Sequence, residues 1–118
     1  MSEPEGRDWR PYVQDMVEFG DRVATYVEGL DQRGFTADQR TYDATLRNLE
    51  LLGEAATHVP ESVREAHPEI AWRQIIGTRN RLAHGYLGID DDVIWDIIQT
   101  DIPALLVALA RLLNDEPP

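Results

Sequence analysis

Residues 36–60 read TADQRTYDATLRNLELLGEAATHVP, and this stretch decides the fold class. Its apolar side chains recur every three or four positions, which is the period of an amphipathic α-helix and not of a strand. Thr36-Ala37-Asp38-Gln39 has the pattern of a capping box and opens the predicted helix. Pro60 ends it, because proline cannot continue a helix. The apolar stripe of this helix comprises Tyr42, Leu46, Leu49, Leu52, Ala56 and Val59.

The same helical spacing continues on both sides of this stretch. We expect a first helix from an N-cap at Asp8 to Glu28, a third from about Glu69 to Leu82 or His84, and a fourth from Asp90 to Leu113. Between the second and third helices, residues 61–67 can form one or two short turns. Pro103 lies inside the fourth helix and should kink it.

Four main helices in 118 residues predict one all-α domain. We expect this domain at residues 8–113, between flexible tails at 1–7 and 114–118. Its predicted architecture is an antiparallel four-helix bundle with a short extra helical turn.

The composition excludes most common enzyme nucleophiles. The chain has no cysteine, so disulfide frameworks, thiol catalysis and cysteine-based zinc sites are excluded. All 11 cationic residues are arginine, which excludes P-loops, Schiff bases and Ser-Lys dyads. The serines are Ser2 and Ser62, and neither lies in a Gly-x-Ser-x-Gly elbow.

The net charge of −11 at pH 7 is opposite to that of a protein that holds nucleic acid by bulk electrostatics. Any activity on RNA or DNA must therefore come from a local arginine cluster. Residues 1–6 carry acid where a signal peptide needs cations and an apolar run. The longest apolar run, Ala104–Ala110, is too short to span a bilayer. We therefore expect a cytoplasmic protein that does not enter membranes.

The residues best suited to chemistry lie at 77–86, which read GTRNRLAHGY. On an ideal helix Arg79 falls within an apolar face, where a cation must find an anion, reach solvent or belong to a site. His84 is rotated by roughly 140° from Arg79, so the two side chains diverge. They can converge only if the helix unwinds toward Gly85 or a second copy of the chain supplies one of them. Asn80 lies one turn before His84 and could orient its imidazole.

An arginine, a histidine and a polar helper are sufficient for phosphodiester cleavage without a metal or another cofactor. The histidine moves a proton to or from the attacking or leaving oxygen, and its unperturbed pKa lies near the working pH. The arginine stabilises the extra negative charge of the phosphorane through its planar fork of donors. RNA supplies its own nucleophile, the 2′-hydroxyl. Arg79, Asn80 and His84 are therefore candidate catalytic residues.

Ordinary structural roles are the alternative for each of these residues. An arginine and a histidine near a helix C-terminus can satisfy its last carbonyls and its dipole, and without further context this is the more common case. We assign structural roles to His58 and His67. The acidic run Asp90–Asp92 fits a helix N-terminus better than a metal site. Gly53 more often permits close helix packing than it binds a ligand.

An ordered set of motifs resembles the HepT-like branch of the HEPN superfamily, the toxin half of bacterial HEPN–nucleotidyltransferase modules. The resemblance covers residues 46–109, more than half of the chain. The matching motifs are Leu52-Gly53-Glu54-Ala55-Ala56, PEIAWRQIIG at 68–77, RNRLAHGY at 79–86, Trp95-Asp96 and Ile102-Pro103.

This resemblance implies an all-helical bundle that pairs two-fold and brings two Arg-x4-His motifs into one cleft. It implies a metal-independent endoribonuclease toxin in which Arg79 and His84 are catalytic and Asn80 is the polar helper. The implied partners are RNA, a second copy of the chain and a cognate nucleotidyltransferase antitoxin. The motif tyrosine maps to Tyr86, which the antitoxin can modify with AMP.

Two other functions remain open at this point. One is a non-catalytic HEPN subunit that binds nucleotide or substrate for an associated nucleotidyltransferase. The other is a helical dimer with only a scaffolding role. The intact pair of Arg79 and His84 favours catalysis, because a scaffold does not need an arginine on its apolar stripe. Tight ATP binding without RNA cleavage would favour the non-catalytic subunit.

Overall fold

The computed structural model describes residues 8–84 and 89–115, and every regular element in these ranges is helical. The four longer helices are α1 (Arg10–Tyr26), α3 (Gln39–Thr57), α5 (Trp72–Ala83) and α7 (Ile102–Asp115). The shorter segments are α2 (Gln32–Ala37), α4 (Glu61–Ala66), α6 (Asp91–Asp96) and the π-helical turn η2 (Ile97–Asp101). The prediction of an all-α chain is confirmed. The N-terminal tail 1–7 lies outside the described residues, and α7 continues two residues beyond the predicted domain boundary.

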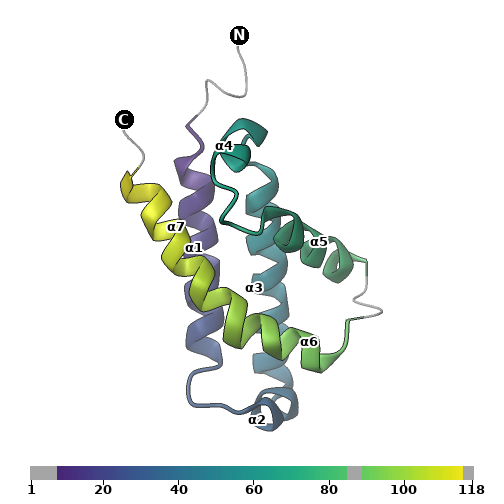
Figure 1. The fold of residues 1–118 in the computed structure, drawn as a ribbon. Helices are drawn as coiled ribbons and strands as arrows, with labels where there is room; N and C mark the ends of the chain where they lie inside the picture. Colours follow the sequence, from purple (N-terminus) through teal and green to yellow (C-terminus); the bar gives the residue numbers. More distant parts are fainter. Residues whose placement is uncertain (1–7, 85–88, 116–118) are drawn as a thin grey trace.

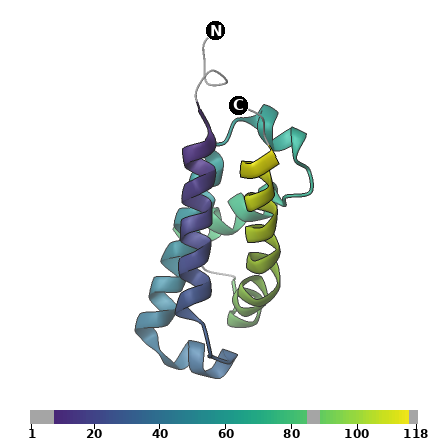
Figure 2. The same ribbon diagram turned by 90° about the vertical axis from the view of Figure 1, so that its left-hand side faces the viewer.

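Helices α1 and α3 form the long antiparallel pair, on which α2, α5 and α7 pack (Figure 1). Segments α6, η2 and α7 follow one another as a continuous rod, and α7 runs beside α1 (Figure 2). Burial of each large apolar side chain contributes about 1.5–3 kcal/mol, so the seams between these helices hold the domain together. The most deeply buried side chains include Val13, Met16, Val23, Phe35, Leu52, Ile94, Leu109 and Leu112.

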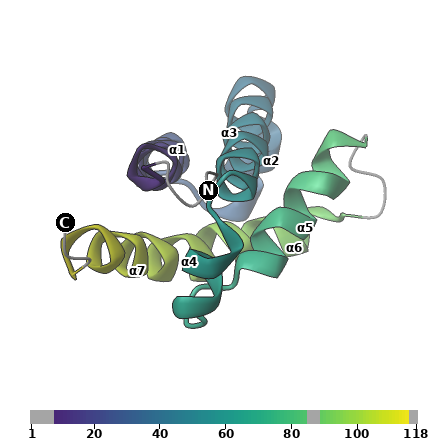
Figure 3. The ribbon, with the colours of Figure 1, turned by 90° about the horizontal axis from the view of Figure 1, so that it is seen from above.

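Helix α5 belongs to a second layer. Seen from above, α1 and α3 lie on one side, and α5 and the α6–α7 rod lie on the other (Figure 3). Helix α5 packs closely against α3, and a cleft lies between α5 and the α6–α7 rod. The four main helices are thus present, but closure into a four-helix bundle is not confirmed, because α5 and α7 do not pack extensively on each other.

Two predicted helix starts are wrong. Helix α1 begins after Trp9, and the Asp8 carboxylate accepts a 3.1 Å hydrogen bond from the backbone N–H of Arg10 without being the N-cap. Helix α5 begins at Trp72 instead of Glu69, because the Trp72 indole donates to the carbonyl of His67 at 3.1 Å and holds the preceding residues in a turn.

The predicted capping box at Thr36 is also wrong. Thr36 lies inside the short helix α2, where its hydroxyl donates to the carbonyl of Arg33. Asp38 is the N-cap of α3, and its carboxylate accepts from both the backbone N–H and the hydroxyl of Thr41. A carboxylate is a strong acceptor for the free N–H groups of a helix start, so the cap falls on the aspartate.

Pro103 disturbs the C-terminal rod one turn before its own position. Its ring removes a backbone donor and crowds the carbonyl four residues earlier, at Gln99. The backbone accommodates this by widening into the π-helical turn η2, in which the N–H of Ile102 donates to the carbonyl of Ile97. The expected irregularity at Pro103 therefore takes the form of a π turn.

The C-terminal rod has an exposed apolar side. Residues 91–114 form a continuous helix that contains an 18-residue window of mean hydropathy 1.6, long enough to cross a membrane by length and composition, a test that core helices of soluble proteins also pass. Its inward side chains, such as Leu109, pack on the core, but Val93 and Val107 are 44% and 56% exposed. The rod therefore presents apolar surface that the described part of the chain does not cover.

Candidate functional site

Helix α5 carries the predicted motif and is held by its first turn. Trp72 is buried, and the preceding Ile70 is also buried in the core. Leu82 anchors the other end, so the helix is fixed at both ends against α3. Helical geometry continues to Ala83, and His84 is the C-cap, with its N–H donating to the carbonyl of Asn80.

Arg79 lies where α5 crosses α3, directly over Gly53. A Cβ atom at position 53 would collide with the Cβ of Arg79 and would lie 3.0 Å from the carbonyl oxygen of Ile75. The absence of a side chain at Gly53 therefore lets the two backbones approach. The prediction that Gly53 serves close helix packing is confirmed.

The guanidinium of Arg79 has two partners. One terminal nitrogen, Nη2, donates to Oε1 of Glu54, and the other, Nη1, donates to Oδ1 of Asn80 at 2.8 Å. The side chains of Arg79 and Glu54 are 32% and 43% exposed, so the pair lies at the edge of the helix crossing and is open to solvent. Of the possibilities that the sequence left open for this cation, the structure shows an anion as its partner, Glu54 on the neighbouring helix.

His84 is exposed at the end of α5. The side-chain oxygen of Asn80, which the sequence placed on the His84 side of the helix, accepts from Arg79. Because α5 stays helical through Ala83, the rotation of roughly 140° between Arg79 and His84 persists, and the structure leaves the two side chains apart. Tyr86, the predicted modification site, lies outside the described residues.

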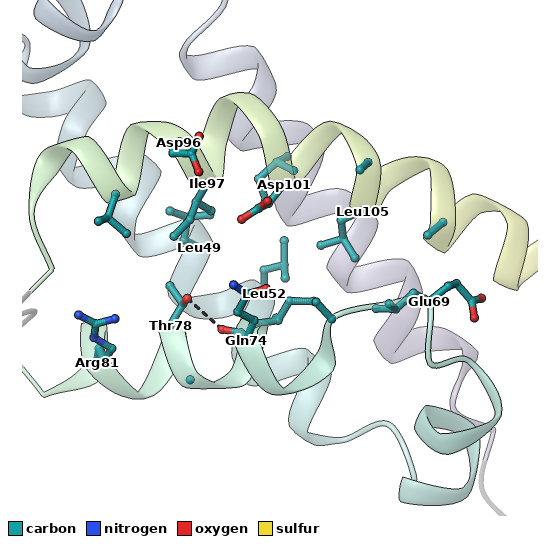
Figure 4. Close-up of a pocket in the computed structure, with 18 of the residues that line it drawn as sticks. Leu49, Leu52, Glu69, Gln74, Thr78, Arg81, Asp96, Ile97, Asp101 and Leu105 are labelled. Carbon is teal, nitrogen blue, oxygen red and sulfur yellow. Dashed lines mark hydrogen bonds between the residues drawn. The ribbon is translucent and has the colours of Figure 1, made fainter.

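The cleft between α5 and the C-terminal rod has a volume of about 610 Å³. Its floor is apolar and comes from α3, while Gln74, Thr78 and Arg81 of α5 face the rod across it (Figure 4). Arg79, Asn80 and His84 are not among the residues that line it. This cleft and the candidate catalytic residues therefore lie on different sides of α5.

Carboxylates line the rod side of the cleft. Asp96 and Asp101 both lie on this wall (Figure 4). Partial burial raises the pKa of the Asp101 carboxyl, and the neighbouring Asp96 carboxylate raises that pKa further. This wall of the cleft therefore disfavours additional negative charge.

The acidic run Asp90–Asp92 lies at the N-terminus of α6, as predicted. Asp90 caps α6 by accepting from the N–H of Val93. Asp91 accepts from the hydroxyl of Tyr42, and Asp92 accepts from the side-chain amide of Gln32, both at 2.6 Å. The three carboxylates thus have separate partners and tie α6 to α3 and α2.

Glu54 is the residue of this site to which the sequence did not assign a role. The signal was present, because Glu54 follows Gly53 in one of the motifs that carry the resemblance. It lies 25 residues before Arg79, and only the crossing of α3 and α5 brings the two side chains together.

Comparisons with known proteins agree with the motif. The model of the family described as "Ribonuclease HepT-like" matches residues 16–112. A "Probable ribonuclease HepT" of Thermococcus cleftensis is 33% identical over 99 residues, which are 84% of this chain and 90% of that protein. A protein of Caldanaerobacter subterraneus named "Putative RNase" is 32% identical over 91% of this chain and 96% of its own length. No solved structure has significant similarity to the chain. The family match spans most of the sequence, and this chain belongs to the ribonuclease HepT-like family.

Proposed function

We propose that this protein is a metal-independent endoribonuclease that acts as the toxin of a HEPN–nucleotidyltransferase toxin–antitoxin system in the cytoplasm. The observation that carries the proposal is the Arg-x4-His motif on α5, in a chain whose relatives are named as ribonucleases. Its arginine is oriented by two hydrogen bonds and its histidine is exposed.

The reaction is an attack of the RNA 2′-hydroxyl on the adjacent phosphorus, which breaks the bond to the 5′-oxygen and leaves a 2′,3′-cyclic phosphate. His84 exchanges the proton with the attacking or leaving oxygen. The N–H donors of Arg79 that do not bond to Glu54 or Asn80 stabilise the charge on the phosphorane. Asn80 holds the guanidinium in place.

The active form in this proposal is a two-fold dimer. Within one chain, Arg79 and His84 diverge, so a second copy is needed to supply the complementary side chain. The cleft beside α5 and the exposed Val93 and Val107 offer apolar surface for an interface. Light scattering should give the mass of a dimer at micromolar concentration, and monomer alone would contradict this part of the proposal.

Neutralisation by the antitoxin is assigned to Tyr86. Transfer of AMP to its hydroxyl adds a negative charge and a bulky nucleotide two residues from His84, which opposes RNA phosphate by repulsion and by steric exclusion. After incubation with the nucleotidyltransferase and ATP, intact-mass spectrometry should detect AMP adducts on the wild type and none on Tyr86→Phe. Adducts that persist in Tyr86→Phe would contradict the assignment of the site.

The ribonuclease itself is tested with purified protein and RNA in the presence of EDTA, followed by mapping of the product ends. We expect cleavage with 2′,3′-cyclic phosphate ends. Loss of cleavage on chelation would contradict metal independence. A dimer that binds ATP tightly and leaves RNA intact would instead support a non-catalytic nucleotide-binding subunit.

A further inference from the structure

Glu54 occupies a position that the proposed reaction does not explain. It follows Gly53 on α3, at the point where the stem of Arg79 crosses that helix. Its Oε1 accepts from Nη2 of Arg79, while Oδ1 of Asn80 accepts from Nη1. Both terminal nitrogens of the guanidinium are thus held, one from each of two helices.

The Glu54 carboxylate is itself supported from the opposite side. Its second oxygen, Oε2, lies 3.4 Å from Nε2 of His58, the residue that caps the C-terminal end of α3. The His58 ring stacks on Tyr12 of α1, with ring centroids 5.0 Å apart and planes inclined by 21°. A continuous chain of contacts therefore runs from α1 through His58 and Glu54 to Arg79.

This arrangement is poorly suited to stabilising the fold. The side chains of Arg79, Glu54 and His58 are 32%, 43% and 50% exposed, and ion pairs that are open to solvent contribute little to the free energy of unfolding. The contacts instead determine the direction in which the guanidinium points. Its planar fork of donors must match the oxygens of a phosphate in order to stabilise that phosphate.

We propose that Glu54 is a positioning residue for the ribonuclease reaction, which holds the guanidinium of Arg79 in the orientation that receives the RNA phosphate. This inference rests on the proposed function. Because the carboxylate is also an anion close to the arriving phosphate, it opposes RNA binding while it aids the chemical step. Its removal therefore has opposite effects on kcat and on affinity.

The kinetic test compares Glu54→Ala, Glu54→Gln and wild type on a short RNA under single-turnover and steady-state conditions. Misplacement of the guanidinium should lower kcat of Glu54→Ala by about 10- to 100-fold. KM should stay the same or fall, because a negative charge has been removed. Glu54→Gln keeps an oxygen acceptor for Arg79 and should recover part of kcat.

Glu50→Ala is the matched control. Glu50 lies one turn earlier on α3 and pairs with Arg47 at 3.4 Å. We expect kcat of Glu50→Ala to equal that of wild type. An unchanged or raised kcat in Glu54→Ala would overturn the proposal, and so would an equal loss in both variants.

A second measurement reads the position of Arg79 without catalysis. In ¹⁵N NMR spectra, the terminal guanidinium N–H signals of Arg79 should show restricted rotation in wild type and in Glu50→Ala, and free rotation in Glu54→Ala. Unchanged Arg79 signals in Glu54→Ala would refute the positioning role. If the wild type cleaves no RNA but these signals respond as expected, the proposed function is wrong. The finding that Glu54 restricts the Arg79 guanidinium would then remain valid.

Discussion

Two glycines mark two helix crossings in this molecule, and the crossings differ in what lies above the glycine. On α1, a Cβ at Gly20 would lie 2.8 Å from Cδ2 of Leu106 and 3.6 Å from Cδ1 of Leu52. On α3, a Cβ at Gly53 would meet the Cβ of Arg79 and the backbone carbonyl of Ile75. A glycine without a side chain lets two helices approach closely at both points, but one crossing is apolar and the other contains a charged side chain.

The two crossings differ in function: the apolar one is a packing contact, and the charged one presents a polar group at the surface. A leucine over a glycine buries apolar area and does nothing else, so the crossing at Gly20 contributes to stability. An arginine over a glycine buries its aliphatic stem and exposes its guanidinium. It buries less apolar area than a leucine does, but it leaves the guanidinium fixed at the surface. We therefore expect loss of the apolar side chain over Gly20 to alter mainly stability, and loss of the polar side chains around Arg79 to alter mainly activity.

The largest effect should come from His84 at the end of the same helix. His84→Ala removes the proposed proton carrier and should lower RNA cleavage by about 10²–10⁴-fold. The side chain is exposed, so the unfolding temperature should hardly change. Leu106→Ala is the control from the apolar crossing and should lower the unfolding temperature while kcat stays near that of wild type. Retained cleavage or retained toxicity in His84→Ala would contradict the mechanism.

Arg79→Ala should lower cleavage by about 10²–10³-fold, as expected for the loss of a donor to a developing anion. Its ion pair with Glu54 is open to solvent, so the free energy of unfolding should fall by less than about 1 kcal/mol. Arg79→Lys should recover little activity, because an ammonium lacks the planar fork. Urea denaturation and RNA cleavage assays on the same preparations separate the two effects. A large loss of stability with a modest loss of activity would show that Arg79 serves mainly in packing and not in catalysis.

The two glycines can be compared directly by substituting alanine at each. Alanine in a helix gains about 1 kcal/mol over glycine. At Gly53 the new Cβ would clash with the backbone carbonyl of Ile75 and the Cβ of Arg79. The cost of overpacking, about 1–3 kcal/mol, should outweigh the gain in helix propensity. At Gly20 it meets the mobile end of Leu106, so the terms should nearly cancel.

Denaturation should therefore rank Gly53→Ala well below Gly20→Ala in stability. Cleavage should fall only in Gly53→Ala, since α5 and Arg79 must shift. Equal stability of the two variants would show that the α3–α5 crossing is looser than its geometry indicates.

The smallest effects should come from two carboxyls with opposite pKa shifts. Partial burial raises the pKa of Asp101, so its charge destabilises the folded state at neutral pH, and this penalty shrinks as pH falls below the raised pKa and is gone below the ordinary carboxyl value. Hydrogen bonds from Thr41 lower the pKa of Asp38, so its stabilising contribution is present above the ordinary carboxyl value and is lost as pH falls toward the lowered pKa. At pH 7, Asp101→Asn should raise the unfolding temperature and Asp38→Asn should lower it. Both differences should shrink in acid, and shifts of the same sign would contradict this assignment.

Much of the helical organisation could be predicted from the sequence. Apolar side chains at helical spacing located α1, α3, α5 and the C-terminal rod within a few residues, because burial of one face imposes that period on any amphipathic helix. The starts were less predictable. Thr36 and Asp38 both fit an N-cap, and the choice between them depended on the short helix α2, which forms against its neighbours.

The candidate site was predictable in its residue types and not in its contacts. The motif at 79–84 identified Arg79, Asn80 and His84, and the helical period already indicated that Arg79 and His84 diverge. The partner of Arg79 was not predictable, because Glu54 lies 25 residues away and reaches it only across a helix crossing. Asn80 was expected to face His84, yet its oxygen bonds to the neighbouring arginine.

By itself the sequence determined the helical class, the types of side chain present at 79–84 and the family. Periodicity, residue type and the order of motifs are properties of the chain alone. Only the tertiary structure decided that Gly53 lies beneath Arg79, that Glu54 holds its guanidinium, and that α5 stands apart from the C-terminal rod across a cleft. The physical reason is that these features depend on how two helices cross. A helix crossing is set by the fit of both surfaces at once, and neither sequence segment contains that information alone.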